Sequence, residues 1–82
     1  MIAKEITEML KKLIAEKTEV DIADVIPEAE FVNDLGADSL AMFELFLSAE
    51  ELFDNDIELS DEEKERVVTV QDLFDLVEKK IS

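Results

Sequence analysis

The residue best suited to covalent chemistry is Ser39, which lies within the segment 31–40, FVNDLGADSL. The chain has no cysteine and no histidine, so the commonest general base, metal ligand and pH switch are all missing. Covalent chemistry is therefore left to a hydroxyl, an amine, a carboxylate or a group that is attached later. A serine without a base placed to activate it is a poor nucleophile, and the composition argues against an enzyme.

The charge of the chain restricts its partners. Asp and Glu number 23 against 8 Lys and Arg, which gives a formal net charge of −15. This charge disfavours binding to nucleic acid and insertion into or binding on anionic membranes. Proteins with basic patches are the natural partners, because the electric field of the chain speeds their encounter. Disorder is disfavoured, since 48% of the residues are hydrophobic and they follow a pattern.

The segment from Ser39 to about Phe53 is predicted to be a helix with Asp38 as its N-cap. At 100° per residue, Glu44 shares one side of this helix with Ser48 and Glu51. The predicted core face consists of Met42, Leu45, Phe46, Ala49, Leu52 and Phe53. Leu40 and Leu47 fall among the polar residues instead, which favours a contact surface.

Apolar residues at spacings of three and four predict a first helix that ends near Lys17. They are Ile2, Ile6, Met9, Leu10, Leu13 and Ile14. A capping box at 60–63 predicts a short third helix that reaches about Arg66. A second cap at 69–72 opens a last helix, with Lys79 and Lys80 at its negative end. The predicted buried stripe of this helix is Val70, Leu73, Phe74, Val77 and Ile81.

Residues 18–38 break the helical period and predict a long ordered loop with a short turn at 22–26. Its apolar residues should hold it to the core: Val20, Ile22, Val25, Ile26, Phe31, Val32 and Leu35. Gly36 is expected where an unusual backbone angle is needed. The fold class is therefore all-α, a small four-helix bundle with three longer helices and a short third one. We expect a single domain over 1–82, a monomer in the cytoplasm, with neither signal peptide nor membrane span.

Segment 31–40 closely resembles the modification site of the acyl carrier proteins of fatty-acid and polyketide synthesis. The resemblance continues through 44–45, 50–51, 53–54 and Ile57 to 69–72. It implies that Ser39, between Asp38 and Leu40, receives 4′-phosphopantetheine from coenzyme A as a phosphodiester. A separate phosphopantetheinyl transferase performs that step, and the thiol of the arm then holds the acyl chain. A first-turn serine also suits a phosphate, because unpaired N–H groups and the helix dipole favour it.

The resemblance also implies docking and cargo sites. Glu44, Glu50 and Glu51 correspond to acidic positions that dock on basic patches of acyltransferases, ketosynthases and related enzymes. Leu40 and Leu47 would supply apolar contacts there, and the docking should be transient and salt-sensitive. In relatives, a cleft under the second helix shelters the acyl chain. Here its expected lining is Phe31, Met42, Phe46, Ala49 and Val67.

This chain departs from the family pattern in several places. Ala41 stands where many relatives carry an acidic residue, which removes a carboxylate near Ser39. Phe43 and Phe46 are larger than usual, while Ala49 is smaller. We consider two explanations: a cleft reshaped for different acyl chains, or compensated repacking of the core. Together with a longer segment 57–70, these features suggest a specialised carrier.

Other functions compete with this interpretation. An aminoacyl or peptidyl carrier, or a carrier for a specialised lipid, would share the modified serine. A purely structural acidic bundle would explain the charge but not the motif. Acidic and hydroxyl residues also match an EF-hand spacing: Asp54, Asp56, Glu58, Ser60, Glu62 and Glu65. Leu59 takes the place of the required glycine, so we expect only weak, non-specific divalent binding.

Overall fold

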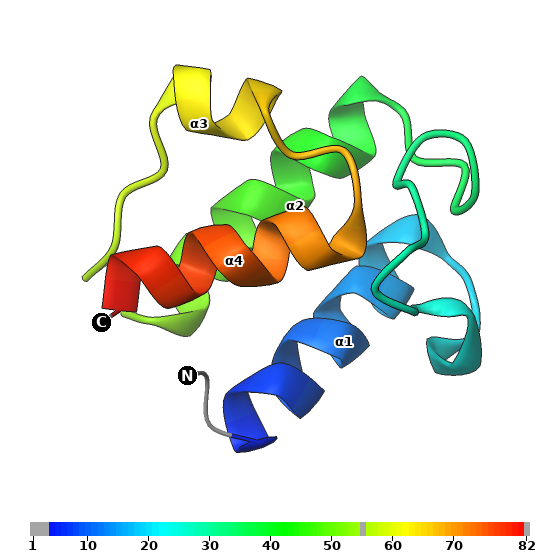
Figure 1. Ribbon diagram of the computed structural model, residues 1–82, viewed down its shortest axis with the longest axis horizontal. Coiled ribbons are helices and arrows are strands. Elements are labelled where there is room, and N and C mark those ends of the chain that lie inside the picture. The colour runs from blue at the N-terminus through cyan, green and yellow to red at the C-terminus, as the bar shows by residue number, and fades with distance from the viewer. Residues whose placement is uncertain (1–3, 55, 82) are drawn as a thin grey trace.

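The structure is a computed structural model that describes residues 4–54 and 56–81. Its helices are α1 (Lys4–Thr18), α2 (Ser39–Leu52), α3 (Asp61–Glu65) and α4 (Val70–Ile81), with a 3₁₀ turn, η1 (Ile22–Asp24), between α1 and α2. The predicted all-α fold with a short third helix is confirmed (Figure 1). Ile2, assigned to the first helix, lies outside the described residues. Among those described, no helix is long and apolar enough to span a bilayer.

Local capping chemistry sets where α3 and α4 begin. The Glu63 N–H donates to Ser60 Oγ at 3.1 Å, and the Ser60 N–H donates to Glu63 Oε1 at 3.0 Å. At α4, the Asp72 N–H donates to Thr69 Oγ1 at 3.1 Å, and the Thr69 N–H donates to Asp72 Oδ2 at 3.0 Å. Both predicted caps are confirmed. Reciprocal bonds of this kind satisfy N–H groups that a helix start leaves unpaired.

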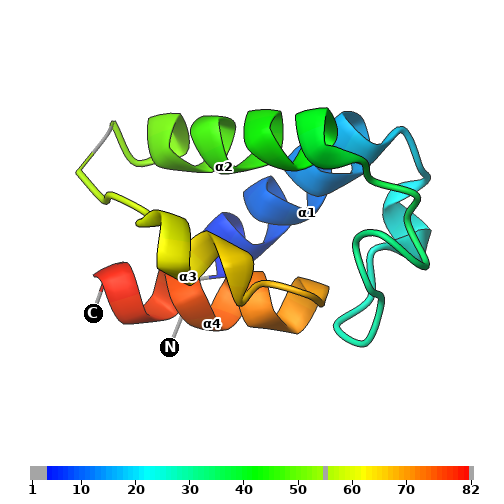
Figure 2. The ribbon, with the colours of Figure 1, turned by 90° about the horizontal axis from the view of Figure 1, so that it is seen from above.

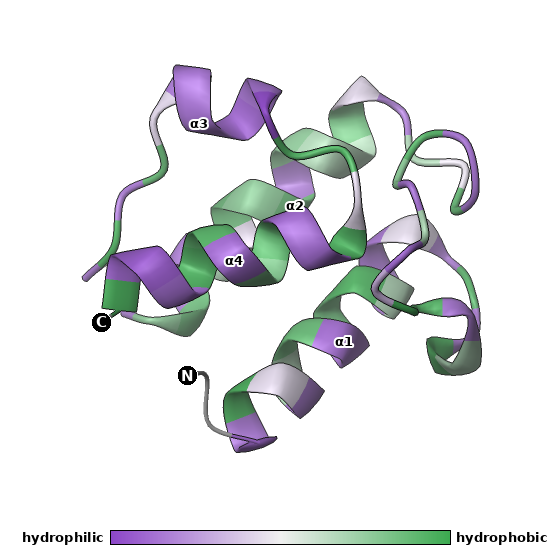
Figure 3. Cartoon of the chain, in the orientation of Figure 1, coloured by the Kyte–Doolittle hydropathy of each residue, from purple (hydrophilic) through white to green (hydrophobic). Residues whose placement is uncertain are grey.

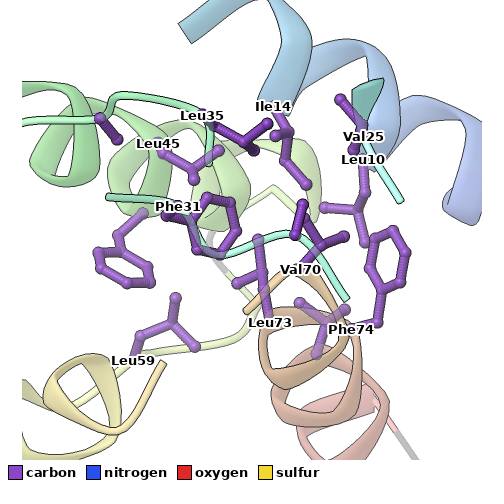
Figure 4. Packing of buried hydrophobic residues seen from close by; sticks show 14 of the residues in the cluster. Leu10, Ile14, Val25, Phe31, Leu35, Leu45, Leu59, Val70, Leu73 and Phe74 are labelled. Atoms are coloured by element: carbon purple, nitrogen blue, oxygen red, sulfur yellow. The ribbon is translucent and has the colours of Figure 1, made fainter. Parts of the chain in front are cut away.

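The core lies between α1, α2, α4 and the loop that precedes α2 (Figure 4). Figure 3 shows α3 as hydrophilic, and none of its residues is buried. Two residues predicted for the buried stripes are exposed, Met9 and Ile81. Met9 lies five residues before the buried Ile14, or about 140° around the helix from it. Ile81 is the last residue of α4 and lines a surface hollow together with Met9.

The loop between α1 and α2 is ordered, as predicted, and main-chain pairing to the start of α4 holds it there. Glu30 and Thr69 form an isolated antiparallel bridge, and the Phe31 N–H donates to the Val68 carbonyl at 3.0 Å. Figures 1 and 2 both place this part of the loop beside the start of α4. Residues 31–35 then form a turn, in which Phe31 and Leu35 are buried and Val32 is exposed.

Not every apolar loop residue reaches the core. Val25 and Leu35 are buried as predicted, together with Ala29 and Ala37. Ile22, Ile26 and Val32 are exposed instead, which corrects the prediction that they hold the loop to the core. None of the residues of the turn η1 is buried, so Ile22 lies at the surface with the rest of this turn. Gly36 has a φ of 69°, and the predicted unusual backbone angle is confirmed.

An ion pair joins the start of α3 to the end of α4. Lys80 Nζ lies 2.8 Å from Glu63 Oε1. The hydrogen bond with Lys80, followed by the one from the Ser60 backbone, lowers the pKa of Glu63 from 4.5 to about 2. Because the folded-state pKa is depressed, the stabilisation is complete above a pH of about 4.5. It is lost as the pH falls toward about 2.

Glu63→Gln is therefore expected to lower the Tm at neutral pH, and the deficit relative to wild type should shrink between pH 4.5 and 2. Thermal melts of both proteins across this pH range measure the difference between their Tm values. The general effect of acid on a chain of charge −15 is common to both proteins and cancels in this difference. Glu65→Gln is the control, since it removes the same charge from an exposed position of α3 that forms no ion pair within the described residues. A deficit that stays constant with pH would contradict the prediction.

Candidate attachment site at the start of helix α2

Ser39 is the first residue of α2, and its side chain is exposed. Asp38 caps the helix as predicted, because its Oδ1 accepts a hydrogen bond from the Ala41 N–H at 2.8 Å. The left-handed backbone of Gly36 turns the chain just before this cap. The first turn of a helix presents N–H groups and a positive dipole end, which together favour a negative group. The serine hydroxyl thus lies where an attached phosphate would be stabilised.

A shallow hollow of about 620 Å³ adjoins Ser39. Its lining consists of Val32, Ala37, Asp38, Ser39, Met42, Phe43, Phe46, Lys64 and Glu65. Met42 and Phe46 are the two predicted cleft residues that line it. Phe31 and Ala49 are buried in the core, and Val67 is half-buried elsewhere. The hollow therefore combines a hydroxyl at its rim with largely apolar walls and one cationic side chain.

The exposed face of α2 continues from Ser39 along the helix. Leu40 is 65% exposed and Leu47 is 46% exposed, as predicted, with Glu44 and Glu51 beside them. Phe43 is 61% exposed and joins the same face. From the sequence, Phe43 is expected only to reshape the cleft, and its place on this face is not predicted. The sequence does contain the information needed to place Phe43 on this face. Phe43 lies four residues before Leu47 and hence only about 40° from it around the helix.

The sequence has well-defined relatives. A family model described as "Phosphopantetheine attachment site" matches residues 8–77. The chain is 56% identical over 72 residues to the acyl carrier protein of Desulforapulum autotrophicum, covering 87% of this chain and 91% of that relative. It is 47% identical over 77 residues to the acyl carrier proteins of Buchnera aphidicola from Acyrthosiphon pisum, strains Tuc7 and APS, covering 94% of each chain. The chain belongs to the acyl carrier protein family.

The cofactor of an acyl carrier protein is a covalently attached 4′-phosphopantetheine. The residues of this carrier fit such a group. The exposed hydroxyl of Ser39 is available for a phosphodiester, and the N-terminal turn of α2 would stabilise its charge. Met42, Phe43 and Phe46 would offer apolar surface to an arm attached there. The phosphopantetheine supplies the thiol that a chain without cysteine lacks.

Glu50 is set apart from the other acidic residues predicted to dock on partners. Its Oε2 accepts a hydrogen bond from the Leu59 N–H at 2.8 Å, in a partly buried position. Glu50 lies six residues after Glu44, which rotates it by about 120° from that residue. In this carrier, Glu50 therefore ties the connection between α2 and α3 to α2. Glu44 and Glu51 remain exposed on the face that contains Leu40.

Acidic residues around the α2–α3 connection do not gather into a metal site. Across residues 4–54 and 56–81, there is no group of three or more acidic side chains that could hold a metal ion. Ser60 is used as the cap of α3, as the helix chemistry predicts, and its Oγ accepts the Glu63 N–H. The side chain of Glu62 pairs with Arg66 at 2.8 Å. Two residues of the EF-hand spacing thus have other roles in the carrier.

Proposed function

We propose that Ser39 is the attachment residue, joined through its Oγ to the phosphate of 4′-phosphopantetheine. In this step the Oγ attacks the pantetheine-side phosphorus of coenzyme A and forms the new P–O bond. The pyrophosphate bond breaks, adenosine 3′,5′-bisphosphate leaves and the hydroxyl proton is released. The observation that carries the proposal is the exposed Ser39 hydroxyl on the first turn of α2, beside an apolar hollow.

Enzymes of biosynthesis are the proposed partners of the α2 face. Leu40, Phe43 and Leu47 offer apolar contacts, and Glu44 and Glu51 offer charges for basic patches. A phosphopantetheinyl transferase would dock here first, followed by acyltransferases and ketosynthases that handle the loaded arm. Exposed ion pairs contribute about 0–1 kcal/mol each, so these complexes should be short-lived and salt-sensitive. We further propose that the whole chain forms one carrier domain that transports acyl groups without catalysing their conversion.

The hollow beside Ser39 is the proposed shelter for the first part of the cargo. Met42 and Phe46 form its apolar walls, and Phe43 extends it toward solvent. The buried ring of Phe46 occupies space beneath α2, which favours a short acyl chain over a long one inside the protein. Stabilisation measured for a series of acyl lengths, in wild type and in Phe46→Val, would test this. Identical profiles in the two proteins would refute the role of Phe46.

The attachment is tested by intact-protein mass after incubation with coenzyme A, magnesium and a broad-specificity phosphopantetheinyl transferase. Wild type should gain the mass of one phosphopantetheine, and Ser39→Ala should gain nothing. Ser48→Ala is the control, since it removes a different hydroxyl from the same helix and should be modified like wild type. A mass gain that persists in Ser39→Ala would move the attachment to another residue. If folded wild type gains no mass, the reaction of Ala41→Asp tells whether the transferase needs the missing carboxylate.

A further inference from the structure

The lining of the hollow beside Ser39 includes one positively charged side chain. Lys64, on α3, lines it together with Ser39, Asp38 and Glu65. The Lys64 Nζ lies 6.0 Å from the centroid of the Phe46 ring, within the range of a cation–π contact. Lys64 forms no ion pair with any residue between 4 and 54 or between 56 and 81. In a chain with 23 acidic and 8 basic residues, such a cation is available for another anion.

The position of Lys64 matters because the rest of the rim is acidic. Asp38 and Glu65 also line the hollow, so a phosphodiester on Ser39 would meet two carboxylates there. The start of α2 attracts the phosphate, but its dipole is equivalent to only about half an elementary charge. Among the residues that line the hollow, Lys64 alone has a side chain of the opposite sign. Its flexible stem and three donors suit a phosphate oxygen.

We propose that Lys64 binds the phosphate of the phosphopantetheine arm and thereby draws α3 toward the start of α2. The proposal rests on Ser39 as the attachment residue. In the unmodified chain, the Lys64 ammonium lies over the Phe46 ring at the edge of the hollow. Modification places an anion on the rim of the same hollow. By binding it, the Lys64 ammonium links α3 to the start of α2. The modified carrier should therefore gain stability that depends on this one side chain.

Arg66 offers a matched comparison on the same segment. It carries the same charge as Lys64 and follows it by two residues, but it pairs with Glu62 at 2.8 Å and does not line the hollow. Replacing either residue changes the net charge of the chain by one unit. Any general response of the carrier to a more negative charge is therefore common to both variants. A response confined to Lys64 isolates its contact with the phosphate.

The experiment compares wild type, Lys64→Met and Arg66→Gln, each before and after modification, with complete conversion verified by mass. The rise in Tm on modification should be smaller in Lys64→Met than in wild type by about 2–4 °C at low salt. Arg66→Gln should show the wild-type rise, and Lys64→Arg should largely restore it. High salt should abolish the difference between wild type and Lys64→Met. The phosphorus-31 resonance of the modified protein should also differ between these two.

Two results overturn the proposal, and they are distinguishable. Equal rises in Tm for wild type and Lys64→Met, with the same phosphorus resonance, mean that the phosphate does not contact Lys64. In that case the mass gain still supports attachment at Ser39. Failure of both the wild type and Ala41→Asp to gain mass instead refutes the attachment itself, and the Lys64 proposal with it. Methionine keeps the length of the lysine stem, so the packing against Phe46 is largely retained.

Discussion

Phe31→Ala is expected to lower the free energy of unfolding by about 3–5 kcal/mol. Phe31 is 1% exposed and is among the largest fully buried side chains of the described residues. It lies among the side chains of Leu45, Val70 and Leu73 (Figure 4). Truncation would remove an aromatic ring from the point where the loop, α2 and α4 meet. Small domains are stable by only about 5–15 kcal/mol, so the loss is a large share of the total.

Val32→Ala provides the control for this prediction. Val32 is the next residue in the chain, but its side chain points to solvent, and its truncation should change stability by less than about 0.5 kcal/mol. Urea unfolding of the three proteins measures both changes, with similar m values as the sign that the unfolded states are comparable. Similar losses for the two variants would mean that Phe31 is not buried in solution as the structure has it.

Glu50→Ala is expected to cost about 1–3 kcal/mol, because it leaves the Leu59 N–H without its acceptor. Leu59 is buried, so water cannot easily replace the carboxylate there. The loss should appear as earlier unfolding in urea and as faster hydrogen exchange of the Leu59 amide. This result would distinguish a side chain that holds the α2–α3 connection from one that is reserved for partners.

Glu51→Ala is the comparison for Glu50→Ala, since both remove one negative charge from adjacent positions of α2. Relief of repulsion within the acidic chain should favour both variants equally. Glu51 is exposed, so its replacement should leave stability within about 0.5 kcal/mol of wild type. It should instead weaken binding to a basic partner enzyme, measured by titration at low salt. A loss of stability as large as that of Glu50→Ala would contradict the assignment.

The parts of this fold that could be predicted from sequence are those governed by neighbouring residues. Asp38, Ser60 and Thr69 each cap a helix through bonds to residues three positions away, and this spacing is readable directly. The exposure of Leu40 and Leu47 follows from helical geometry alone. The segment around Ser39 is equally local, so the sequence alone predicts that Ser39 lies at the start of a helix.

The remaining features depend on contacts between distant segments. Hydrophobicity alone could not tell Phe31, which is buried, from Val32, which is exposed, because pairing with residues near Thr69 decides their orientation. Phe31 and Ala49 were assigned to an acyl cleft for the same reason, since core and cleft residues are both apolar. Glu50 resembled its acidic neighbours until the position of the Leu59 N–H was known. The position of Lys64 beside the hollow could not be predicted, because tertiary packing alone brings α3 to the start of α2.

The bridge between Glu30 and Thr69 also has a consequence for how the chain folds. In the sequence, α2 and α3 lie between Glu30 and Thr69. The bridge therefore forms only after segments far apart in the chain have come together. Loop-closure entropy opposes this step, whereas the first turns of α2 can form early from their own cap. The start of α2 and the loop before it should therefore become ordered at different stages of folding. The turn that carries the serine forms first, and the segment that leads into it becomes ordered once the start of α4 has arrived.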